Sequence, residues 1–420
     1  MKNTMFILSF LCFCFSSCDI IEDLFGRGDA DPPYNANIAW VSSLVVNNSS
    51  SHTVDGDSVY FFERPPGYTT TNIYALTKLD ARTGVFTWRS PVLFSNIIFA
   101  QPLVKDGYVY VLLQTRTILC FNRETGEHTA TLNVDIENKG LMFRLYFGTI
   151  YREFIYLSLW GSGDSYFARL DLNSIDQSGD GKSVQNVTPQ ILWEPEISYI
   201  VASKPVIYNN TVFTGTHGWR DRPVELAGFD LDSLAMVFHG TFGGAGDINS
   251  NNALFEQGNR ENPILIQDGI LYYLGGSTSA WDIASGKMLY RHIITYEIPL
   301  HERYPSDCRQ PVYHQGKIYY TSLSSYLHCI DAATGRLVWN ITTVNSESLR
   351  TNPIIVRNKL YVPQYNGFWV YKPENGKLLG VDKTFRGDSF GRNILYNDYI
   401  ICIRDDKNGD GRLVAVDVGR

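Results

Sequence analysis

The segment Ile330-Asp-Ala-Ala-Thr-Gly-Arg-Leu-Val-Trp339 holds the pattern that decides the fold: an apolar strand ending in Asp, a Gly turn, and a Trp four residues after the Gly. A close copy is Leu79-Asp-Ala-Arg-Thr-Gly-Val-Phe-Thr-Trp88. The chain ends on the first half of another copy, Leu413-Val-Ala-Val-Asp417, and Ile38-Ala-Trp-Val41 is the predicted missing strand. A repeat split across the two termini predicts a closed ring in which the end strands pair.

The position of Asp331 recurs along the chain at intervals of 41–59 residues. Propeller blades typically repeat every ~40–50 residues. In five copies a Gly follows four residues later, and it supplies the positive φ that a tight hairpin needs. Ala130 and Gly380 replace the large ring that follows, so blades two and seven are predicted to be degenerate. The eight positions are Asp80, Asn122, Asp171, Asp230, Asp282, Asp331, Lys372 and Asp417.

A second pattern precedes each of these positions: an apolar strand led by Pro, a polar turn, and a strand rich in Val, Ile and Tyr. Pro102 to Tyr110 and Pro263 to Tyr273 are two examples. Asp-Gly pairs between β-forming residues are strong hairpin signals. The sequence therefore predicts an all-β fold, an eight-bladed β-propeller of four-stranded antiparallel blades over residues 37–420, closed by the N- and C-terminal strands in one blade. No stretch after the leader has sustained helical periodicity.

The first residues have the features of a secretory leader: a basic start, an apolar run over residues 5–15 and a small residue before Cys18. The run is too short to span a bilayer comfortably. The site resembles a bacterial lipoprotein cleavage box, although Phe15 stands where Leu is usual, and ordinary secretion is the alternative. We predict a lipoprotein signal peptide over residues 1–18, acyl chains on Cys18, and a flexible polar tether over residues 19–36.

Charge and cysteine content limit the partners. The formal net charge is −7 with no basic block, which argues against nucleic acid. Four cysteines follow the leader: Cys120, Cys308, Cys329 and Cys402. Cys308 and Cys329 share a predicted blade and could pair, but we favour small buried thiols.

The repeats at Asp80 and Asp331 resemble the PQQ-type propeller repeat, over about residues 37–420. One branch of that superfamily is the quinoprotein dehydrogenases, which bind pyrroloquinoline quinone and calcium. Another contains lipid-anchored scaffolds similar to BamB, which serve outer-membrane protein assembly. The enzymatic branch fits poorly, because such dehydrogenases carry adjacent cysteines against the cofactor and this chain has no Cys-Cys pair. We therefore expect no catalytic residues, no cofactor and no PQQ.

Two acidic turns are candidate calcium loops. Asp406, Asn408 and Asp410 match the start of an Asp-x-Asn-x-Asp-Gly loop, and residues 176–182 are a looser copy. Alternate side chains of such a loop deliver the oxygens that calcium prefers. Because position nine is Val in both, we favour a polar turn whose side chains satisfy the local backbone.

Four arginines form the predicted partner-binding site. Arg260, Arg309 and Arg350 lie two or three residues before the Pro that opens a strand, and Arg392 precedes the equivalent strand of blade eight. If these strands are the innermost ones, the four loops converge on one mouth of the central channel. Guanidinium groups suit carboxylates and peptide carbonyls. Solvated loop arginines paired with nearby acids are the alternative.

The sequence thus predicts a non-catalytic extracytoplasmic binding scaffold, anchored by lipid to a bacterial membrane, with the outer membrane favoured. Its expected partners are envelope proteins or peptide segments, which it would bind as a monomer within a complex. The specific hypothesis is a BamB-like role in outer-membrane protein assembly. The alternatives are a quinone-dependent dehydrogenase-like enzyme and a surface lipoprotein that binds glycan or protein.

Overall fold

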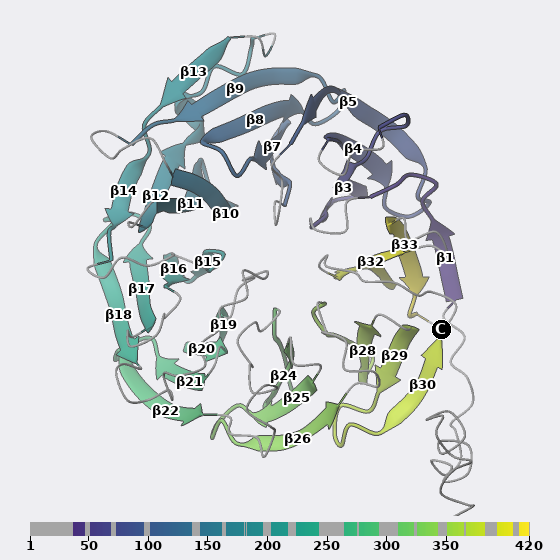
Figure 1. Ribbon diagram of the computed structural model, residues 1–420. Helices are drawn as coiled ribbons and strands as arrows, with labels where there is room; N and C mark the ends of the chain where they lie inside the picture. Colours follow the sequence, from purple (N-terminus) through teal and green to yellow (C-terminus); the bar gives the residue numbers. More distant parts are fainter. Residues whose placement is uncertain are drawn as a thin grey trace, which may run out of the picture.

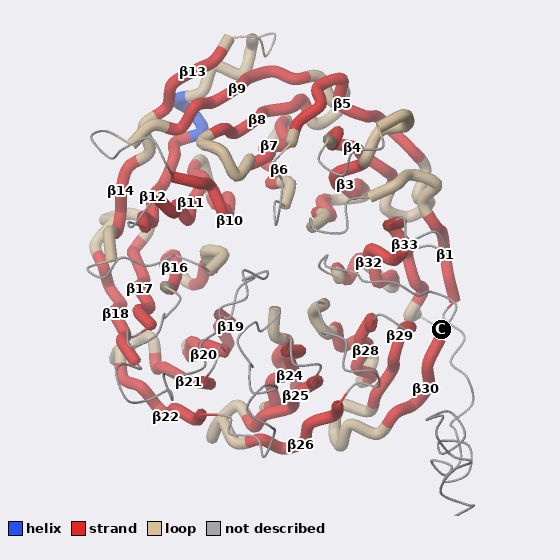
Figure 2. The backbone as a smooth tube through the Cα atoms, in the orientation of Figure 1, coloured by secondary structure: helices blue, strands red, loops and turns tan. Residues whose placement is uncertain are grey.

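The protein is a ring of eight small β-sheets, seen along the ring axis in the computed structural model (Figure 1). One short 3-10 helix is the sole helical element of the residues described, and it lies beside β13 (Figure 2). The structure describes residues 37–46, 51–68, 73–95, 101–136, 143–161, 165–179, 181, 183–195, 203–216, 224–242, 264–274, 277–293, 310–322, 326–342, 351–364, 367–382, 393–405 and 411–419.

Each blade has four antiparallel strands, as predicted. Blade 1 consists of β2 (Thr53–Asp55), β3 (Ser58–Glu63), β4 (Tyr74–Asp80) and β5 (Phe86–Phe94), and blade 2 of β6 (Leu103–Lys105), β7 (Tyr108–Leu112), β8 (Thr117–Asn122) and β9 (His128–Val134). Blade 3 consists of β10 (Phe143–Tyr151), β11 (Phe154–Gly161), β12 (Ser165–Asp171) and β14 (Gln190–Trp193), and blade 4 of β15 (Val206–Tyr208), β16 (Thr211–Gly215), β17 (Val224–Asp230) and β18 (Met236–Phe242).

The remaining four blades complete the ring in chain order. Blade 5 consists of β19 (Ile264–Gln267), β20 (Ile270–Leu274), β21 (Ser277–Asp282) and β22 (Lys287–Ile293), and blade 6 of β23 (Val312–His314), β24 (Lys317–Ser322), β25 (Tyr326–Asp331) and β26 (Leu337–Thr342). Blade 7 consists of β27 (Ile354–Val356), β28 (Lys359–Gln364), β29 (Gly367–Tyr371) and β30 (Leu378–Asp382), and blade 8 of β31 (Ile394–Tyr396), β32 (Tyr399–Asp405), β33 (Gly411–Asp417) and β1 (Asn37–Val41).

The two ends of the chain close the ring in blade 8. Strand β1 pairs antiparallel with β33, and Ile38 lies opposite Val416. The next segment ties blade 8 to blade 1, because Val46 forms β-bridges to both Gly411 and Glu63. The predicted circular closure is therefore confirmed (Figure 1).

The acidic column builds the turn between the third and fourth strands. Asp331 Oδ1 accepts hydrogen bonds from Thr334 N at 2.8 Å and Thr334 Oγ1 at 2.7 Å. Asp80 makes the same contacts with Thr83. Slight burial raises the pKa of Asp80, but these hydrogen bonds outweigh it and hold the pKa below its usual value. The Asp side chain thus replaces backbone partners that a turn leaves unsatisfied.

The large rings of the column lock consecutive blades together. Trp88 of blade 1 donates from Nε1 to the carbonyl oxygen of Arg123 in blade 2, at 3.1 Å. Its ring fills the space above Gly126, where an added Cβ would lie 2.5 Å from the indole. The turn glycine thus does two things, because it adopts φ +74° and also leaves room for the neighbouring ring.

The core is divided among the interfaces between blades. At the first interface, Tyr60 and Phe62 of blade 1 pack with Val109 and Phe121 of blade 2. Side chains from both faces of each sheet are thereby removed from water, which is the main stabilising term for such a ring. Blades 2 and 7, whose repeats are degenerate in sequence, still contain all four expected strands, and Ala130 and Gly380 are buried.

Blade 2 carries a fifth strand that the sequence did not predict. After β12, the chain forms the 3-10 helix η1 (Leu172–Ser174) and an insertion that ends in β13 (Val184–Val187). Strand β13 pairs parallel to β9, the outer strand of blade 2, before the chain returns to blade 3. Blade 2 lacks a Trp on β9, and His128 instead lies against Gly181 of this insertion.

Candidate functional site

Every residue of the sequence-predicted sites lies outside the described residues. This holds for the lipidation site, the partner-binding arginines and the calcium loop. The residues are Cys18, Arg260, Arg309, Arg350, Arg392, Asp406, Asn408 and Asp410.

The premise behind the arginine site is met, because the Pro-led strands are innermost. Strands β19, β23 and β27 each form the inner edge of their blade, and consecutive members contact one another (Figure 2). The antiparallel order of the blades starts all of these strands at one end of the ring, which we call the loop face. We call the opposite end the hairpin face; it carries the turns between first and second strands and between third and fourth strands.

Buried polar residues fix the chain just before these strands. Thr351 donates from Oγ1 to the carbonyl oxygen of Pro363 at 2.6 Å. Its own carbonyl accepts from Thr321 Oγ1 of blade 6, also at 2.6 Å. Asn352 of blade 7 and Asn393 of blade 8 hydrogen-bond each other. The backbone nitrogen of Asn393 donates to Asn352 Oδ1 at 2.7 Å, and Asn352 Nδ2 donates to the carbonyl oxygen of Asn393 at 3.0 Å. The loop face therefore has a rigid polar base at blades 6 to 8.

The looser calcium-like turn is part of the β13 insertion. Asp176 Oδ1 accepts from the backbone nitrogen of Ser178 at 3.0 Å and from its hydroxyl at 2.6 Å. These hydrogen bonds lower the pKa of Asp176. The side-chain amide of Gln185 hydrogen-bonds the backbone of Asp176 twice. Gln185 Oε1 accepts from the nitrogen of Asp176, and Gln185 Nε2 donates to the carbonyl oxygen of Asp176. These contacts agree with the polar-turn interpretation.

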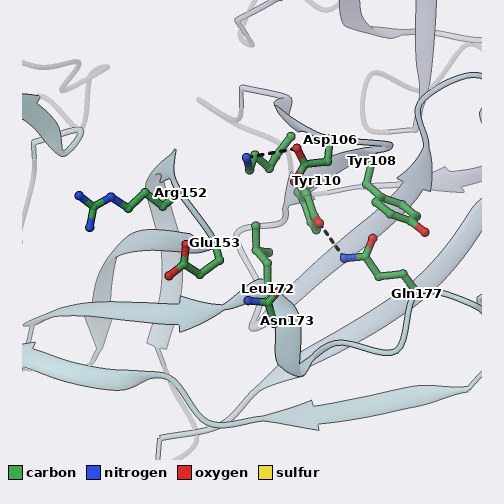
Figure 3. Close-up of a pocket in the computed structure, with 9 residues that line it drawn as sticks. Asp106, Tyr108, Tyr110, Arg152, Glu153, Leu172, Asn173 and Gln177 are labelled. Carbon is green, nitrogen blue, oxygen red and sulfur yellow. Dashed lines mark hydrogen bonds and ion pairs between the residues drawn. The ribbon is translucent and has the colours of Figure 1, made fainter. Parts of the chain in front are cut away.

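A groove of about 470 Å³ opens on the hairpin face between blades 2 and 3 (Figure 3). Two hairpin turns border it, and η1 with the following insertion forms its third side. Nine residues line it: Lys105, Asp106, Tyr108, Tyr110, Arg152, Glu153, Leu172, Asn173 and Gln177.

The floor of the groove is polar. Gln177 Nε2 donates to the hydroxyl oxygen of Tyr110 at 2.8 Å, as Figure 3 shows. Tyr110 is 1% exposed, and burial raises the pKa of its phenol well above the usual value, so the hydroxyl keeps its proton. Gln177 Oε1 is buried and has no hydrogen-bond partner among the described residues.

Both basic residues of the groove, Lys105 and Arg152, are paired with carboxylates of the protein. Lys105 Nζ lies 3.2 Å from Asp106 Oδ1. Arg152 reaches away from the groove into blade 4, where Nη1 lies 2.6 Å from Asp232 Oδ1 and Nη2 donates to Asn210 (Figure 3). Cross-blade ion pairs of this kind also join blades 7 and 8, through Arg357.

The described cysteines are structural. Cys120, Cys329 and Cys402 are free, fully buried thiols on the third strands of blades 2 and 6 and the second strand of blade 8. Burial raises the pKa of Cys329 to about 11 and that of Cys120 to about 12. Thiols held protonated in this way are poor nucleophiles and poor metal ligands.

Within the described part of the chain, no group of three or more His, Cys, Asp and Glu side chains is arranged to hold a metal ion. The same residues contain no helix that is both long and apolar enough to cross a bilayer. Sequence reasoning missed the groove, although Asp171 without a following Gly marked an irregular turn at this place.

A family described as outer membrane protein assembly factor BamB matches residues 275–419. Quinoprotein alcohol dehydrogenase PedH of Pseudomonas putida is 26% identical over 194 residues, which are 41% of this chain and 30% of that protein. The chain spans less than a third of the length of the curated relatives it matches.

Solved structures share the fold at low identity. BamB of Moraxella catarrhalis has a TM-score of 0.57 and 12% identity, with 92% of this chain and 99% of that chain covered. A europium-containing methanol dehydrogenase has a TM-score of 0.65 and 10% identity, with 91% and 93% covered. The ring of eight four-stranded blades is the fold that these structures share, and the match of residues 275–419 supports the resemblance of the Asp-Gly-Trp repeats to PQQ-like repeat propellers.

Proposed function

We propose that this protein is a non-catalytic, extracytoplasmic binding scaffold with a BamB-like role in outer-membrane protein assembly. The observation that carries the proposal is the match of residues 275–419 to the BamB assembly-factor family. That stretch runs from the second half of blade 5 to the end of blade 8. It contains Arg309, Arg350 and Arg392, three of the four arginines proposed to bind the partner.

The described geometry supports a partner surface on the loop face. The innermost strands start there side by side, and buried hydrogen bonds of Thr351 and Asn352 anchor the residues that directly follow Arg350. A site on an ordered base loses little conformational entropy on binding. Guanidinium forks in that position suit carboxylates or backbone carbonyls of an envelope protein.

In this proposal the chain reaches the membrane through Cys18, and residues 19–36 form the tether. Strand β1, the first described element, lies at the outer edge of blade 8, so a tether would leave the ring at its rim (Figure 1). Replacement of Cys18 by Ser is expected to move the protein from the membrane fraction to the soluble periplasmic fraction.

The partner proposal is tested by affinity purification of the tagged full chain from detergent-solubilised envelopes. We expect β-barrel assembly components to co-purify, and we expect Arg309→Glu with Arg350→Glu to abolish this. Arg336→Glu is the matched control, because Arg336 is an exposed residue of a blade 6 turn on the hairpin face. Co-purification that survives the double substitution would refute the arginine surface. Absence of assembly components from the wild-type sample would refute the role.

The likeness to PedH keeps a quinone-dependent dehydrogenase as the second candidate. Such an enzyme would hold calcium through several oxygen ligands and bind pyrroloquinoline quinone beside it. Dye-linked oxidation of primary alcohols after addition of the quinone and calcium would favour the enzyme. The scaffold proposal expects no turnover above that of the cofactors alone.

A further inference from the structure

We propose that the hairpin face of blades 5 to 7 docks on the surface of an anionic lipid bilayer. The inference deepens the proposed function, since it rests on the lipid anchor at Cys18 and says how an anchored ring would lie on its membrane. Three features support it: the charge of this face, the apolar residues beside that charge, and the point where the chain enters the ring.

The hairpin face is divided into a basic part and an acidic part. In blades 5 to 7, its turns and the residues that flank them expose two acidic residues and five basic ones, which are Lys287, Arg336, Arg357, Lys372 and Lys377. The equivalent turns of blades 1 to 4, outside the β13 insertion, expose two basic residues and six acidic ones within the described chain. These six are Asp57, Asp106, Glu124, Glu127, Glu153 and Asp232. The basic part is therefore a local exception in a chain whose net charge is −7.

Internal ion pairs neutralise the basic part incompletely. Arg357 pairs with Asp398 of blade 8 at 2.9 Å. The carboxylate of Glu374 instead accepts from the side-chain amide of Asn358. Among the residues that the structure describes, no carboxylate forms an ion pair with the three remaining exposed cations that lie on blades 5, 6 and 7, namely Lys287, Arg336 and Lys372. Their charge is available to an anionic ligand.

Exposed aliphatic residues accompany the basic charge. In blades 5 and 6, the basic residue that follows the turn Gly is itself followed by two apolar residues that are 39–48% exposed. The strands that carry them, β22 and β26, are neighbours along the outer rim of the ring (Figure 1). Cations beside aliphatic side chains suit the interface of a bilayer, because the charges meet phosphates while the apolar groups reach the acyl boundary. The four residues are Met288, Leu289, Leu337 and Val338.

Apolar exposure alone does not distinguish blades 5 and 6. Met236 and Val237 of blade 4 occupy the same position and are 43% and 56% exposed. There the preceding residue is Ala235, and the exposed carboxylate of Asp232 lies in the same turn. An anionic surface would repel that turn, so the combination of both features selects blades 5 and 6.

The chain enters the ring beside the basic part and on the same face. Asn37 lies opposite Asp417, and its Nδ2 donates to Asp417 Oδ2 at 3.2 Å. Asp417 ends the third strand of blade 8 at the hairpin face, next to blade 7. The 18 residues between Cys18 and Asn37 can span at most about 65 Å. Acyl chains on Cys18 would therefore keep the basic part close to the bilayer, where even a weak contact is populated.

These features favour a bilayer over a second copy of the chain. The basic part of one ring could face the acidic part of another, but such packing would enclose the chain entry at Asn37 between the two rings. On a bilayer, the acidic part of blades 1 to 4 would tilt away from the lipid phosphates. The loop face would then point away from the membrane, which leaves the proposed arginine site open to an envelope protein.

The test uses the soluble Cys18→Ser form of the full chain and sucrose-loaded vesicles. The bound fraction is measured by sedimentation on phosphatidylcholine vesicles with and without phosphatidylglycerol. We expect binding to the phosphatidylglycerol vesicles that high salt removes, and much weaker binding to phosphatidylcholine alone. Lys287→Gln with Arg336→Gln should weaken binding about 25-fold, since each basic residue at an anionic surface contributes about fivefold.

Two matched controls use the equivalent positions of blades 1 and 4. Val85→Glu with Ala235→Glu lowers the net charge by the same amount at exposed residues, and it should leave vesicle binding nearly unchanged. Leu337→Ser with Val338→Ser should weaken binding about fivefold, whereas Met236→Ser with Val237→Ser should not. All four double variants should keep the melting temperature of the parent, because the substituted residues are exposed.

Equal binding to both kinds of vesicle, or equal losses in the two charge variants, would overturn the proposal. So would a salt-sensitive dimer in light scattering that Lys287→Gln with Arg336→Gln dissociates while no vesicles are bound. The basic part would then bind the acidic part of a second copy. The partner purification is done in detergent, without a bilayer, so Arg336→Glu remains a valid control there. Either experiment can fail without the other.

Discussion

The indole of Trp40 lies directly over Gly84, and its Nε1 donates a 3.1 Å hydrogen bond to the carbonyl oxygen of Ala81 in the same turn. Trp40 comes from the strand that completes blade 8, and Gly84 from the turn of blade 1. The contact therefore joins the last blade to the first across the point where the chain closes. The same contact recurs at Trp88 and Trp339, so one short repeat specifies both a turn and an interface between blades.

Gly84→Ala should destabilise the protein by about 2–5 kcal/mol. About 1–2 kcal/mol comes from a Cβ at φ +69°, and the rest from displacing the Trp40 ring, which would lie 2.6 Å away. Gly286→Ala is the matched control: its φ is +67°, but its Cβ would meet no described atom within 4 Å. It should cost only about 1–2 kcal/mol. If urea unfolding showed that Gly84→Ala and Gly286→Ala lose the same unfolding free energy, the contact of the Trp40 indole with Gly84 would contribute nothing to stability.

Local repeats made most of the fold predictable. Asp331, Gly335 and Trp339 lie within one short segment and specify a local turn. The spacing between copies of this segment is enough to count the blades. The second role of the Gly was not visible, because the ring above it belongs to the preceding blade. The split repeat predicted that the two terminal strands pair, since an incomplete sheet at each end leaves two edges to satisfy, and the structure places Ile38 opposite Val416.

The groove and β13 could not be predicted for a physical reason. Strand β13 pairs with β9, some fifty residues earlier in the chain, in a parallel register that no local turn determines. The segment around Asp176 has the composition of a turn, so its path across two blades depends on contacts such as Leu172 and Val187 in the shared core. Tyr110 and Gln177 meet only because of that path.

Arg89→Met should cost about 2–4 kcal/mol of unfolding free energy. Glu63 is 1% exposed, and Arg89 holds it through two hydrogen bonds of 2.7 and 2.5 Å. Without the guanidinium, the hydroxyl of Thr77 is the one side-chain donor that the described residues still offer the buried carboxylate, and an uncompensated buried charge is strongly destabilising.

Arg357→Met is the control for this pair. Arg357 and Asp398 also form an ion pair, at 2.9 Å, but both side chains are more than half exposed. Solvent screening should limit the loss there to about 0–1 kcal/mol. Urea unfolding of the two variants provides the measurement. Similar losses for the two substitutions would contradict the claim that burial decides the difference.

Cys120, Cys329 and Cys402 should not react with an aromatic disulfide reagent at pH 8 while the protein is folded. All three are buried, and burial raises their pKa values, so little thiolate forms and the reagent has no access. Thiols would be counted before and after denaturation in a variant with Cys18→Ser and Cys308→Ser. We expect none of these three thiols to react in the native state and three additional equivalents to react once the protein is unfolded. Rapid native-state labelling would show that one of these strands opens readily.

Stability should fall as the pH is lowered from about 6.5 towards 3, with His328 as one identifiable cause. His328 is fully buried between Tyr320 and Tyr326, and burial lowers its pKa to about 3. The unfolded chain, with a pKa of about 6.5, then binds one more proton than the folded chain throughout this window. The contribution of His328 to the free energy of unfolding is therefore complete above pH 6.5, and it decreases by about 1.4 kcal/mol for each pH unit below that value.

His328→Phe should remove this part of the pH dependence, whatever it does to the absolute stability. The aromatic ring can still pack between the two tyrosines, but it has no proton to bind. Urea unfolding of both proteins between pH 5 and 8 would give the two slopes. The slopes should coincide above pH 7, because His328 is neutral there in both the folded and the unfolded state. Below pH 6 the slope of the variant should be smaller by about 1.4 kcal/mol per unit, and parallel curves down to pH 5 would show that His328 is not kept neutral by its burial.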